Sequence, residues 1–105
     1  MKIIETPIFT KRMISLLTNE EYRNLQNELI VNPGKGKIIK GSGGLRKLRW
    51  GISGRGKSGG VRIIYYWILN KETILMLLVY AKSEQDNLTP AQLKVLKALV
   101  KKELQ

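Results

Sequence analysis

The stretch VRIIYYWILNKETILMLLVYA, residues 61–81, consists of two apolar runs separated by a short polar segment. The runs are rich in Ile, Val and Tyr, which are enriched in strands, and Asn70–Glu72 is typical of a turn. The second run is almost wholly apolar, as expected of a central strand that is covered on both faces. We therefore expect adjacent antiparallel strands over Val61–Leu69 and Thr73–Ala81.

A third strand is predicted over Leu45–Ile52, where apolar and basic residues alternate. Successive side chains of a strand point to opposite faces of the sheet. Lys47 and Arg49 therefore share one face, and the loop from Ser53 to Gly60 follows them. The other face would carry Leu48, Trp50 and Ile52.

The segments before these strands predict helices. Thr18-Asn-Glu-Glu21 has the form of a capping box, in which each of the two outer side chains accepts a hydrogen bond from the other's backbone N–H. An apolar stripe at helical spacing follows it, and Asn32-Pro33-Gly34 ends that helix. A first helical segment is expected over Lys11–Leu17. A short first strand is expected near the N-terminus, from Ile3, Ile4, Ile8 and Phe9. Pro7 would either end this strand or place it at an edge of the sheet.

The last helix is predicted to begin at Thr89-Pro90, a capping residue followed by proline at the first helical position. The order strand, helices, three strands, helix indicates a single α+β domain over residues 1–105. We expect a small twisted antiparallel sheet with two N-terminal helices and one C-terminal helix. The helices would cover one face, and Lys47 and Arg49 would point into the open face.

Composition limits the chemistry of the chain. It has 105 residues, 19 Lys and Arg against 8 Asp and Glu, and a formal net charge of +11. A basic domain of this size is typical of a nucleic-acid binder. The chain has no Cys and no His, which excludes disulfides, thiolate metal sites and nucleophiles activated by histidine. A catalytic site would have to use Lys, Arg, Tyr and a few carboxylates.

The positive charge is concentrated in one stretch. Residues 29–71 contain no Asp or Glu, and they hold ten Lys or Arg together with all ten glycines. Basic side chains on a glycine-rich backbone suit phosphate, and RNA is the polyphosphate that we favour. The plainer alternative is a basic face that only meets solvent.

No segment has the pattern of a membrane span or a signal peptide. The longest apolar run, Ile74–Ala81, has eight residues, whereas a spanning helix needs about 20. The N-terminal residues lack the long apolar run of a signal peptide. We therefore expect a cytosolic protein.

Three motifs carry a resemblance to a known family. They are GGLRKLR (43–49), GKSGGVRIIYY (56–66) and YAKSEQDNLT (80–89), on the predicted strands and their connections. Together they resemble the RelE/ParE toxin superfamily and, within it, the RelE-like HigB toxins of type II toxin–antitoxin systems. The resemblance covers nearly the whole chain.

The resemblance implies an mRNA interferase, an endoribonuclease that cuts messages on the translating ribosome. Cleavage would proceed through the ribose 2′-OH, and no metal or organic cofactor is expected. The implied partners are the ribosome, mRNA and a cognate HigA-like antitoxin. Many antitoxins of the HigA type carry a helix-turn-helix DNA-binding domain. The implied fold agrees with the one that the residue patterns predict.

Metal-free cleavage needs a base for the 2′-OH, cations that stabilise charge on the phosphate, and an acid for the leaving oxygen. In a chain without His, lysine is the leading base candidate, and neighbouring cations favour its neutral form. By position in the family pattern, Lys47 would be the base and Arg49 would help to hold phosphate. Arg62 would bind the scissile phosphate through its planar fork.

Lys82 would contact phosphate or assist the acid step, unless it pairs with Glu84 or Asp86. The chain departs from the family pattern here, because Ser83 stands where some RelE members have arginine, and no aromatic residue follows Tyr80. The identity of the acid stays open, and a proton-transfer or positioning role for either carboxylate is neither supported nor excluded. Wider contacts with RNA or the ribosome would come from Arg46, Arg55, Lys57, Lys35, Lys37 and Lys40.

Two alternatives come from other functional classes. ParE-like relatives share the expected fold and act on DNA gyrase without cutting RNA. A basic RNA-binding or ribosome-binding protein would use its charge only as an anchor. The nuclease is favoured by the concentration of Lys47, Arg49, Arg62 and Lys82.

Overall fold

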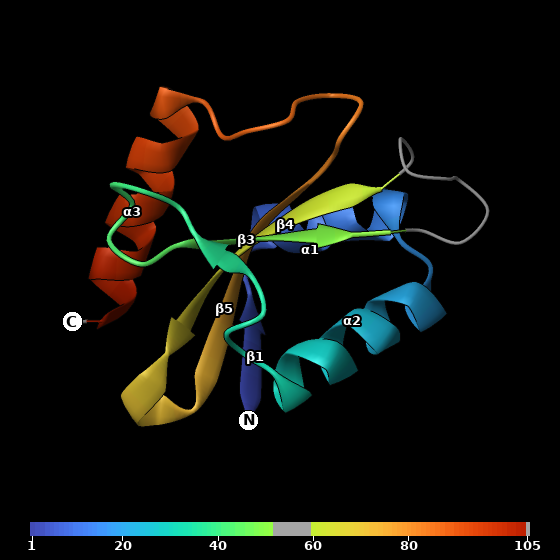
Figure 1. Ribbon diagram of the computed structural model, residues 1–105, viewed down its shortest axis with the longest axis horizontal. Helices are drawn as coiled ribbons and strands as arrows, with labels where there is room; N and C mark the ends of the chain where they lie inside the picture. Colours follow the sequence, from blue (N-terminus) through green and yellow to red (C-terminus); the bar gives the residue numbers. More distant parts are fainter. Residues whose placement is uncertain (52–59, 105) are drawn as a thin grey trace.

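The computed structural model describes residues 1–51 and 60–104 of the chain. Helices surround a five-stranded sheet whose strand order is β1-β5-β4-β3-β2 (Figure 1). The elements are β1 (Lys2–Glu5), α1 (Pro7–Leu16), α2 (Asn19–Val31), β2 (Lys37–Ile38), β3 (Arg46–Trp50), β4 (Val61–Ile68), the 3₁₀ turn η2 (Leu69–Lys71), β5 (Thr73–Ala81) and α3 (Pro90–Leu104). This arrangement confirms the predicted α+β fold. None of the helices formed by the described residues is long and apolar enough to cross a membrane.

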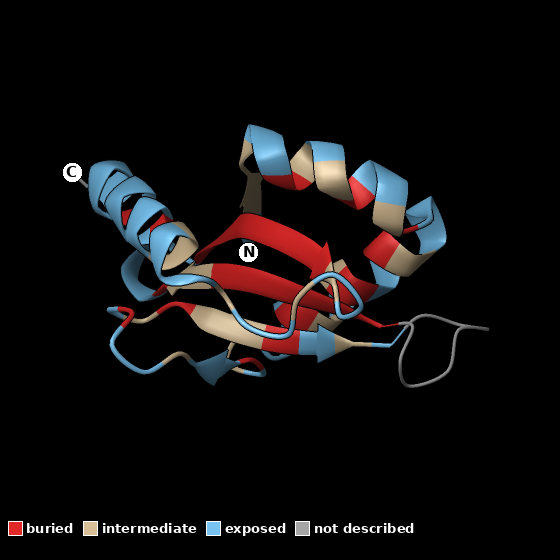
Figure 2. Cartoon of the chain, turned by 90° about the horizontal axis from the view of Figure 1, so that it is seen from above, coloured by how far each residue is buried: buried red, intermediate tan, exposed pale blue. Residues whose placement is uncertain are grey.

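The two strands predicted from residues 61–81 form the centre of the sheet. β4 and β5 pair antiparallel along their full lengths. Glu72, in the turn between them, has a left-handed backbone with φ 46°. Almost every residue of both strands is buried (Figure 2), so the prediction of a central strand covered on both faces is confirmed for β5.

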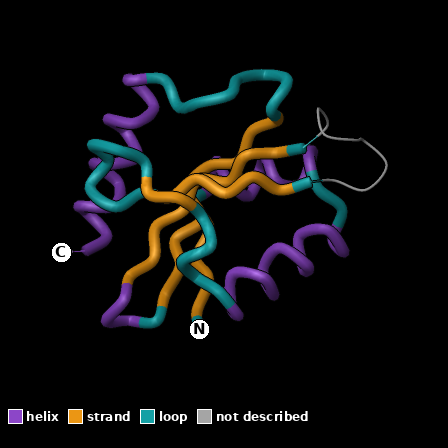
Figure 3. Tube along the Cα trace, in the orientation of Figure 1, coloured by secondary structure: helices purple, strands orange, loops and turns teal. Residues whose placement is uncertain are grey.

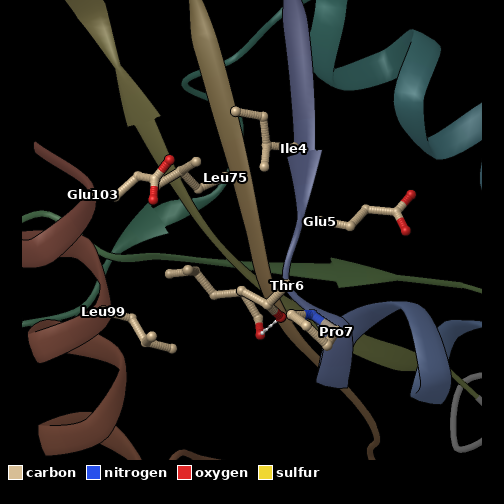
Figure 4. Close-up of a pocket in the computed structure, with 8 residues that line it drawn as sticks. Ile4, Glu5, Thr6, Pro7, Leu75, Leu99 and Glu103 are labelled. Atoms are coloured by element: carbon tan, nitrogen blue, oxygen red, sulfur yellow. Dashed lines mark hydrogen bonds between the residues drawn. The ribbon is translucent and has the colours of Figure 1, made fainter.

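A bulge in β5 is tied to the start of α1. The register of the two central strands shifts between Ile64 and Tyr65, and Leu77 is the extra residue in β5. The Leu77 carbonyl accepts a hydrogen bond from the Thr6 hydroxyl at 2.9 Å (Figure 4). The same hydroxyl accepts from the backbone N–H of Phe9 at 3.1 Å and so caps α1. One threonine therefore joins the irregular point of the sheet to the first helix.

The first helix begins earlier than predicted. Pro7 takes the first helical position, where its missing N–H removes no helical hydrogen bond. Ile8 and Phe9 belong to α1, so the expectation that they extend the first strand was wrong. That strand ends at Glu5 and runs parallel to β5 at the sheet edge, which makes the sheet mixed and not wholly antiparallel.

The predicted caps of α2 and α3 are confirmed. The backbone N–H of Glu21 donates to the Thr18 hydroxyl at 3.1 Å, and the N–H of Thr18 donates to the Glu21 carboxylate at 2.8 Å. Thr89 and Gln92 exchange an equivalent pair of bonds at the start of α3, at 3.0 and 3.1 Å. These reciprocal bonds satisfy backbone donors that the first helical turn leaves free.

The helices cover both faces of the sheet, which corrects the expectation of one open face. α1 and α2 pack on one face, through a cluster that includes Phe9, Leu25 and Tyr65. α3 packs on the opposite face through Leu96 and Val100. The physical reason lies in β4 and β5, whose apolar side chains alternate between both faces and must be shielded from water on each.

A hollow of about 210 Å³ lies between β1, β5 and α3. Its lining is mostly aliphatic and comes from Ile4, Glu5, Thr6, Pro7, Leu75, Leu77, Leu99 and Glu103 (Figure 4). The Glu5 carboxylate already accepts a hydrogen bond from the Tyr22 hydroxyl at 2.6 Å. This hollow lies at the β1 side of the sheet, opposite the edge formed by β3 and β2.

We predict that Tyr65→Phe lowers the free energy of unfolding by about 1–3 kcal/mol. The Tyr65 hydroxyl accepts from the backbone N–H of Gly36 at 2.8 Å and donates to the Pro33 carbonyl at 2.7 Å. Its loss would leave both backbone groups without this partner. Urea denaturation followed by circular dichroism measures the change. Tyr66→Phe is the matched control, and equal losses in the two variants would contradict this account.

Candidate functional site

Two adjacent strands bring three of the predicted site residues to one face of the sheet. In β3, Lys47 and Arg49 alternate with the buried Leu48, as predicted. Arg62 of β4 is the direct register partner of Arg49, and directly paired residues have Cβ atoms about 5 Å apart on the same face. Lys47 pairs with Ile64, which belongs to the cluster under α3. The three cations therefore lie on the α3 side of the sheet.

Arg62 is the buried cation of this group, with 5% of its surface exposed. Its contacts are weak: Nη1 donates to the Val61 carbonyl at 3.4 Å, and Nη2 lies 3.6 Å from the Asp86 carboxylate. Its Nε is buried and has no hydrogen-bond partner among the described residues. A buried charge is costly unless it is both paired and hydrogen-bonded. The guanidinium can therefore donate further hydrogen bonds to another acceptor.

A loop connects β5 to α3 (Figure 3), and its residues supply polar partners to this face. Asp86 faces Arg62, and the amide oxygen of the next residue, Asn87, accepts a hydrogen bond from Lys47 Nζ at 2.6 Å. The Tyr80 hydroxyl donates to the backbone carbonyl of Asp86 at 3.4 Å. Burial raises the pKa of the Tyr80 phenol, although the charge of Arg62 acts in the opposite direction. The phenol thus stays protonated near neutral pH and can donate.

Sequence reasoning missed Asn87 and Tyr80. Tyr80 ends an apolar run, which is the pattern of a core residue, and only its register pairing with Arg62 reveals its place beside the cations. Asn87 lies in a polar connection whose path the sequence does not give. The acidic and amide residues of the motif YAKSEQDNLT were the available signal for polar groups at this site. They indicated Asp86 as a candidate but did not assign its role.

Lys82 directly follows the end of β5. It is exposed, and its backbone N–H donates to the Gly60 carbonyl at 3.0 Å. Glu84 instead forms an ion pair with Arg12, and hydrogen bonding from that guanidinium holds the pKa of Glu84 below its usual value. No ion pair among the described residues includes Lys82, so the alternative pairing with Glu84 or Asp86 is not observed.

Arg46 lies on the opposite face from Lys47 and has structural contacts. Its Nη1 donates to the carbonyls of Gly34 and Gly36, at 3.2 and 2.8 Å. Its guanidinium also lies over the Trp67 ring, 5.9 Å from the centroid. These bonds hold the chain before β2 against the sheet and turn Arg46 away from the other cations, so its geometry gives the expected RNA contact no support.

The remaining cations lie around β2 and β3. Lys37 is the register partner of Lys47, and a hollow of about 340 Å³ is lined by Lys35, Lys37, Lys47, Leu48 and Arg49. Lys35 also forms an ion pair with Glu28 at 2.7 Å, and Lys40 is exposed. Arg55 and Lys57 lie outside the described residues. No group of three or more carboxylates that could hold a metal ion occurs in the described part of the chain, and the basic lining suits an anion.

Comparison with known proteins identifies the family. A family model described as the RelE toxin of the RelE/RelB toxin–antitoxin system matches residues 1–105. The chain belongs to the RelE toxin family. A free-state structure of a double arginine-to-alanine mutant of E. coli RelE has 14% identity and a TM-score of 0.57, over 81% of this chain and 86% of that one. The toxin–antitoxin complex RelBE of E. coli gives 17% identity and a TM-score of 0.58, over 76% of this chain and 94% of the matched chain.

These identities are low, so the two solved structures establish a common fold. The shared RelE-like architecture consists of two N-terminal helices, a mixed sheet and a C-terminal helix. The roles of individual side chains in this RelE-family chain have to be inferred from its own geometry.

We predict that Arg49→Ala changes the free energy of unfolding by no more than about 0.5 kcal/mol, because the side chain is exposed. Lys47→Ala should behave similarly. Arg46→Ala, on the same strand and opposite face, should cost about 1–3 kcal/mol through its two bonds to backbone carbonyls. Thermal and urea unfolding of the three variants measures this. A large loss from Arg49→Ala would show that the assigned faces are wrong.

Proposed function

We propose that this RelE-family chain is the toxin of a type II toxin–antitoxin system and a ribosome-dependent mRNA endoribonuclease of the HigB type. The observation that carries the proposal is the convergence of Lys47, Arg49 and Arg62 on one face, where the fork of the buried arginine lacks strong partners. A cluster of this kind attracts the RNA backbone. Family membership supplies the toxin class.

The proposed reaction uses the substrate's own ribose. The 2′-oxygen attacks the adjacent phosphorus, and the bond from phosphorus to the 5′-oxygen of the next nucleotide breaks. The products are a 2′,3′-cyclic phosphate and a 5′-hydroxyl end. A base accepts the 2′-OH proton, and an acid gives a proton to the leaving oxygen. Cations on the phosphate oxygens stabilise the charge that develops in the transition state.

Lys47 is the proposed base. Its Nζ is directed toward Asn87 by a 2.6 Å hydrogen bond, which holds the amine over the strands that carry the arginines. Arg62 would bind the scissile phosphate, because its planar fork matches two phosphate oxygens at once. Arg49, its exposed cross-strand neighbour, would hold a further phosphate oxygen.

Lys82 is the proposed group for the acid step or for a further phosphate contact. It is exposed two residues beyond Tyr80, which is the register partner of Arg62. Glu84 is the weaker candidate, because its ion pair with Arg12 keeps it ionised. A fully ionised carboxylate has no proton to give to a leaving oxygen.

Cations outside the cluster would hold the wider RNA. The hollow beside β2 offers Lys35 and Lys37 next to Lys47, which gives the backbone a basic path toward the proposed base. Lys40, Arg55 and Lys57 would contribute further contacts to mRNA or ribosomal RNA. Phosphate contacts of this kind bind without regard to sequence.

A cognate antitoxin is the proposed protein partner. One of the two E. coli structures with this fold is the RelBE toxin–antitoxin complex. For this chain we propose a HigA-like antitoxin with a helix-turn-helix DNA-binding domain. Action on translating ribosomes would place the toxin in the cytoplasm.

Primer extension on a translated message tests the nuclease. We expect new 5′ ends within the coding region only when ribosomes are present. Lys47→Ala should slow their formation by about 10²–10⁴-fold, the usual contribution of a general base. Arg62→Ala should also remove the ends. Lys71→Ala is the control, because that lysine lies in η2, at the opposite end of the β4–β5 pair from Arg62.

Other outcomes would contradict the proposal. New ends in the absence of ribosomes would indicate a general ribonuclease. An intact message together with a defect in DNA supercoiling would favour a ParE-like gyrase inhibitor. Ribosome binding without any cleavage would favour a basic anchor protein.

A further inference from the structure

The contact between Arg62 and Asp86 is asymmetric. The arginine side chain is 6% exposed, whereas the aspartate side chain is 64% exposed. Their closest atoms are 3.6 Å apart, which is too far for a hydrogen bond. Moving the Asp86 carboxylate away from Arg62 into water therefore costs little free energy. The guanidinium, in contrast, is held in place by its burial. Only the acidic partner of this pair is replaceable.

The loop that carries Asp86 is anchored on both sides of that residue. Before it, Glu84 binds Arg12 and accepts from the backbone N–H of Ala81. After it, Asn87 accepts a hydrogen bond from the proposed base, Lys47. The carboxylate itself accepts no hydrogen bond among the described residues, and its position depends on its attraction to Arg62.

The guanidinium has unused donors on the same face. Nε is buried without a partner, and the Nη1 bond to the Val61 carbonyl is long, at 3.4 Å. A phosphate group offers several strong acceptor oxygens, and paired N–H···O bonds to arginine are stronger than a distant charge contact. A phosphate could therefore satisfy donors that the aspartate leaves unsatisfied.

We propose that Asp86 is a displaceable counter-ion that occupies Arg62 in the free protein and that a backbone phosphate of RNA replaces. This inference rests on the proposed function, because it takes RNA as the ligand of the cluster. Asp86 then has two opposing effects: its charge stabilises the free fold, and it lowers the affinity for RNA. It acts through Arg62 and is not a catalytic residue.

The test compares Asp86→Asn with Glu84→Gln. Each variant removes one negative charge from the same loop, but Glu84 binds Arg12 and not Arg62. The ligand is an RNA oligonucleotide with 2′-O-methyl groups throughout, which cannot be cleaved through a 2′-OH. Binding is measured by fluorescence anisotropy without ribosomes. We expect Asp86→Asn to bind about fivefold more tightly than Glu84→Gln, the scale of one weak ion pair.

A double-mutant cycle separates the local effect from net charge. In an Arg62→Gln background, the gain from Asp86→Asn should disappear, because the arginine that the aspartate occupies is absent. Asp86→Asn should also lower the Tm of the free protein, and saturating oligonucleotide should reduce that difference. If Asp86→Asn binds no more tightly than Glu84→Gln, or if its gain persists without Arg62, the counter-ion proposal is wrong.

A measurement on the unmodified chain keeps the proposal testable if Asp86→Asn does not fold. In NMR spectra of the arginine side chains, the Arg62 Nε–H signal should shift and exchange more slowly with solvent when the oligonucleotide binds. An unchanged signal at saturation would overturn the proposal. These measurements do not depend on cleavage. If RNA displaces Asp86 but no ribosome-dependent cleavage occurs, only the proposed nuclease function is refuted. If mRNA is cleaved but Asp86 is not displaced from Arg62, only the counter-ion proposal is refuted.

Discussion

The antiparallel pairing of β4 with β5 is the constraint on which the rest of the structure depends. Both strands are buried on both faces, so the pair requires helices on each side of the sheet. The bulge at Leu77 changes which residues face each layer, and Thr6 satisfies its carbonyl while starting α1. Each Å² of apolar surface that this burial removes from water contributes about 25 cal/mol to the free energy of unfolding, so the pair contributes to stability through both layers of the core.

The same pairing creates the chemical problem at the site. Near one end of β4, a strand that is otherwise apolar, Arg62 lies beside Tyr80 of β5 and opposite Arg49 of β3. Like charges directly across two strands destabilise a sheet, and burial adds the cost of desolvation. Asp86 offsets only part of that cost, because it is distant and mostly in water. The site thus carries unsatisfied positive charge that an anion would stabilise.

Local patterns in the sequence were sufficient for β3, β4 and β5 and for two of the three helix starts. The caps at Thr18 and Thr89 depend on hydrogen bonds between residues that are close in the chain, so the local sequence is enough to predict them. The start of α1 was missed because Thr6 is fixed by a bulge far along the chain. Placement of α3 on the second face, the burial of Arg62 and the loop path to Asn87 all arise from long-range packing, which periodicity alone does not specify.

Net charge does not identify a site, whereas the partners of each cation do. Arg46 is as basic as Arg49, yet its guanidinium is bound by two backbone carbonyls. A cation with strong internal partners has little to gain from phosphate, because binding would break those bonds. Arg62 is the contrary case, since burial fixes its direction and its present contacts are weak. Arg62 therefore has more to gain from binding an anion than Arg46 has.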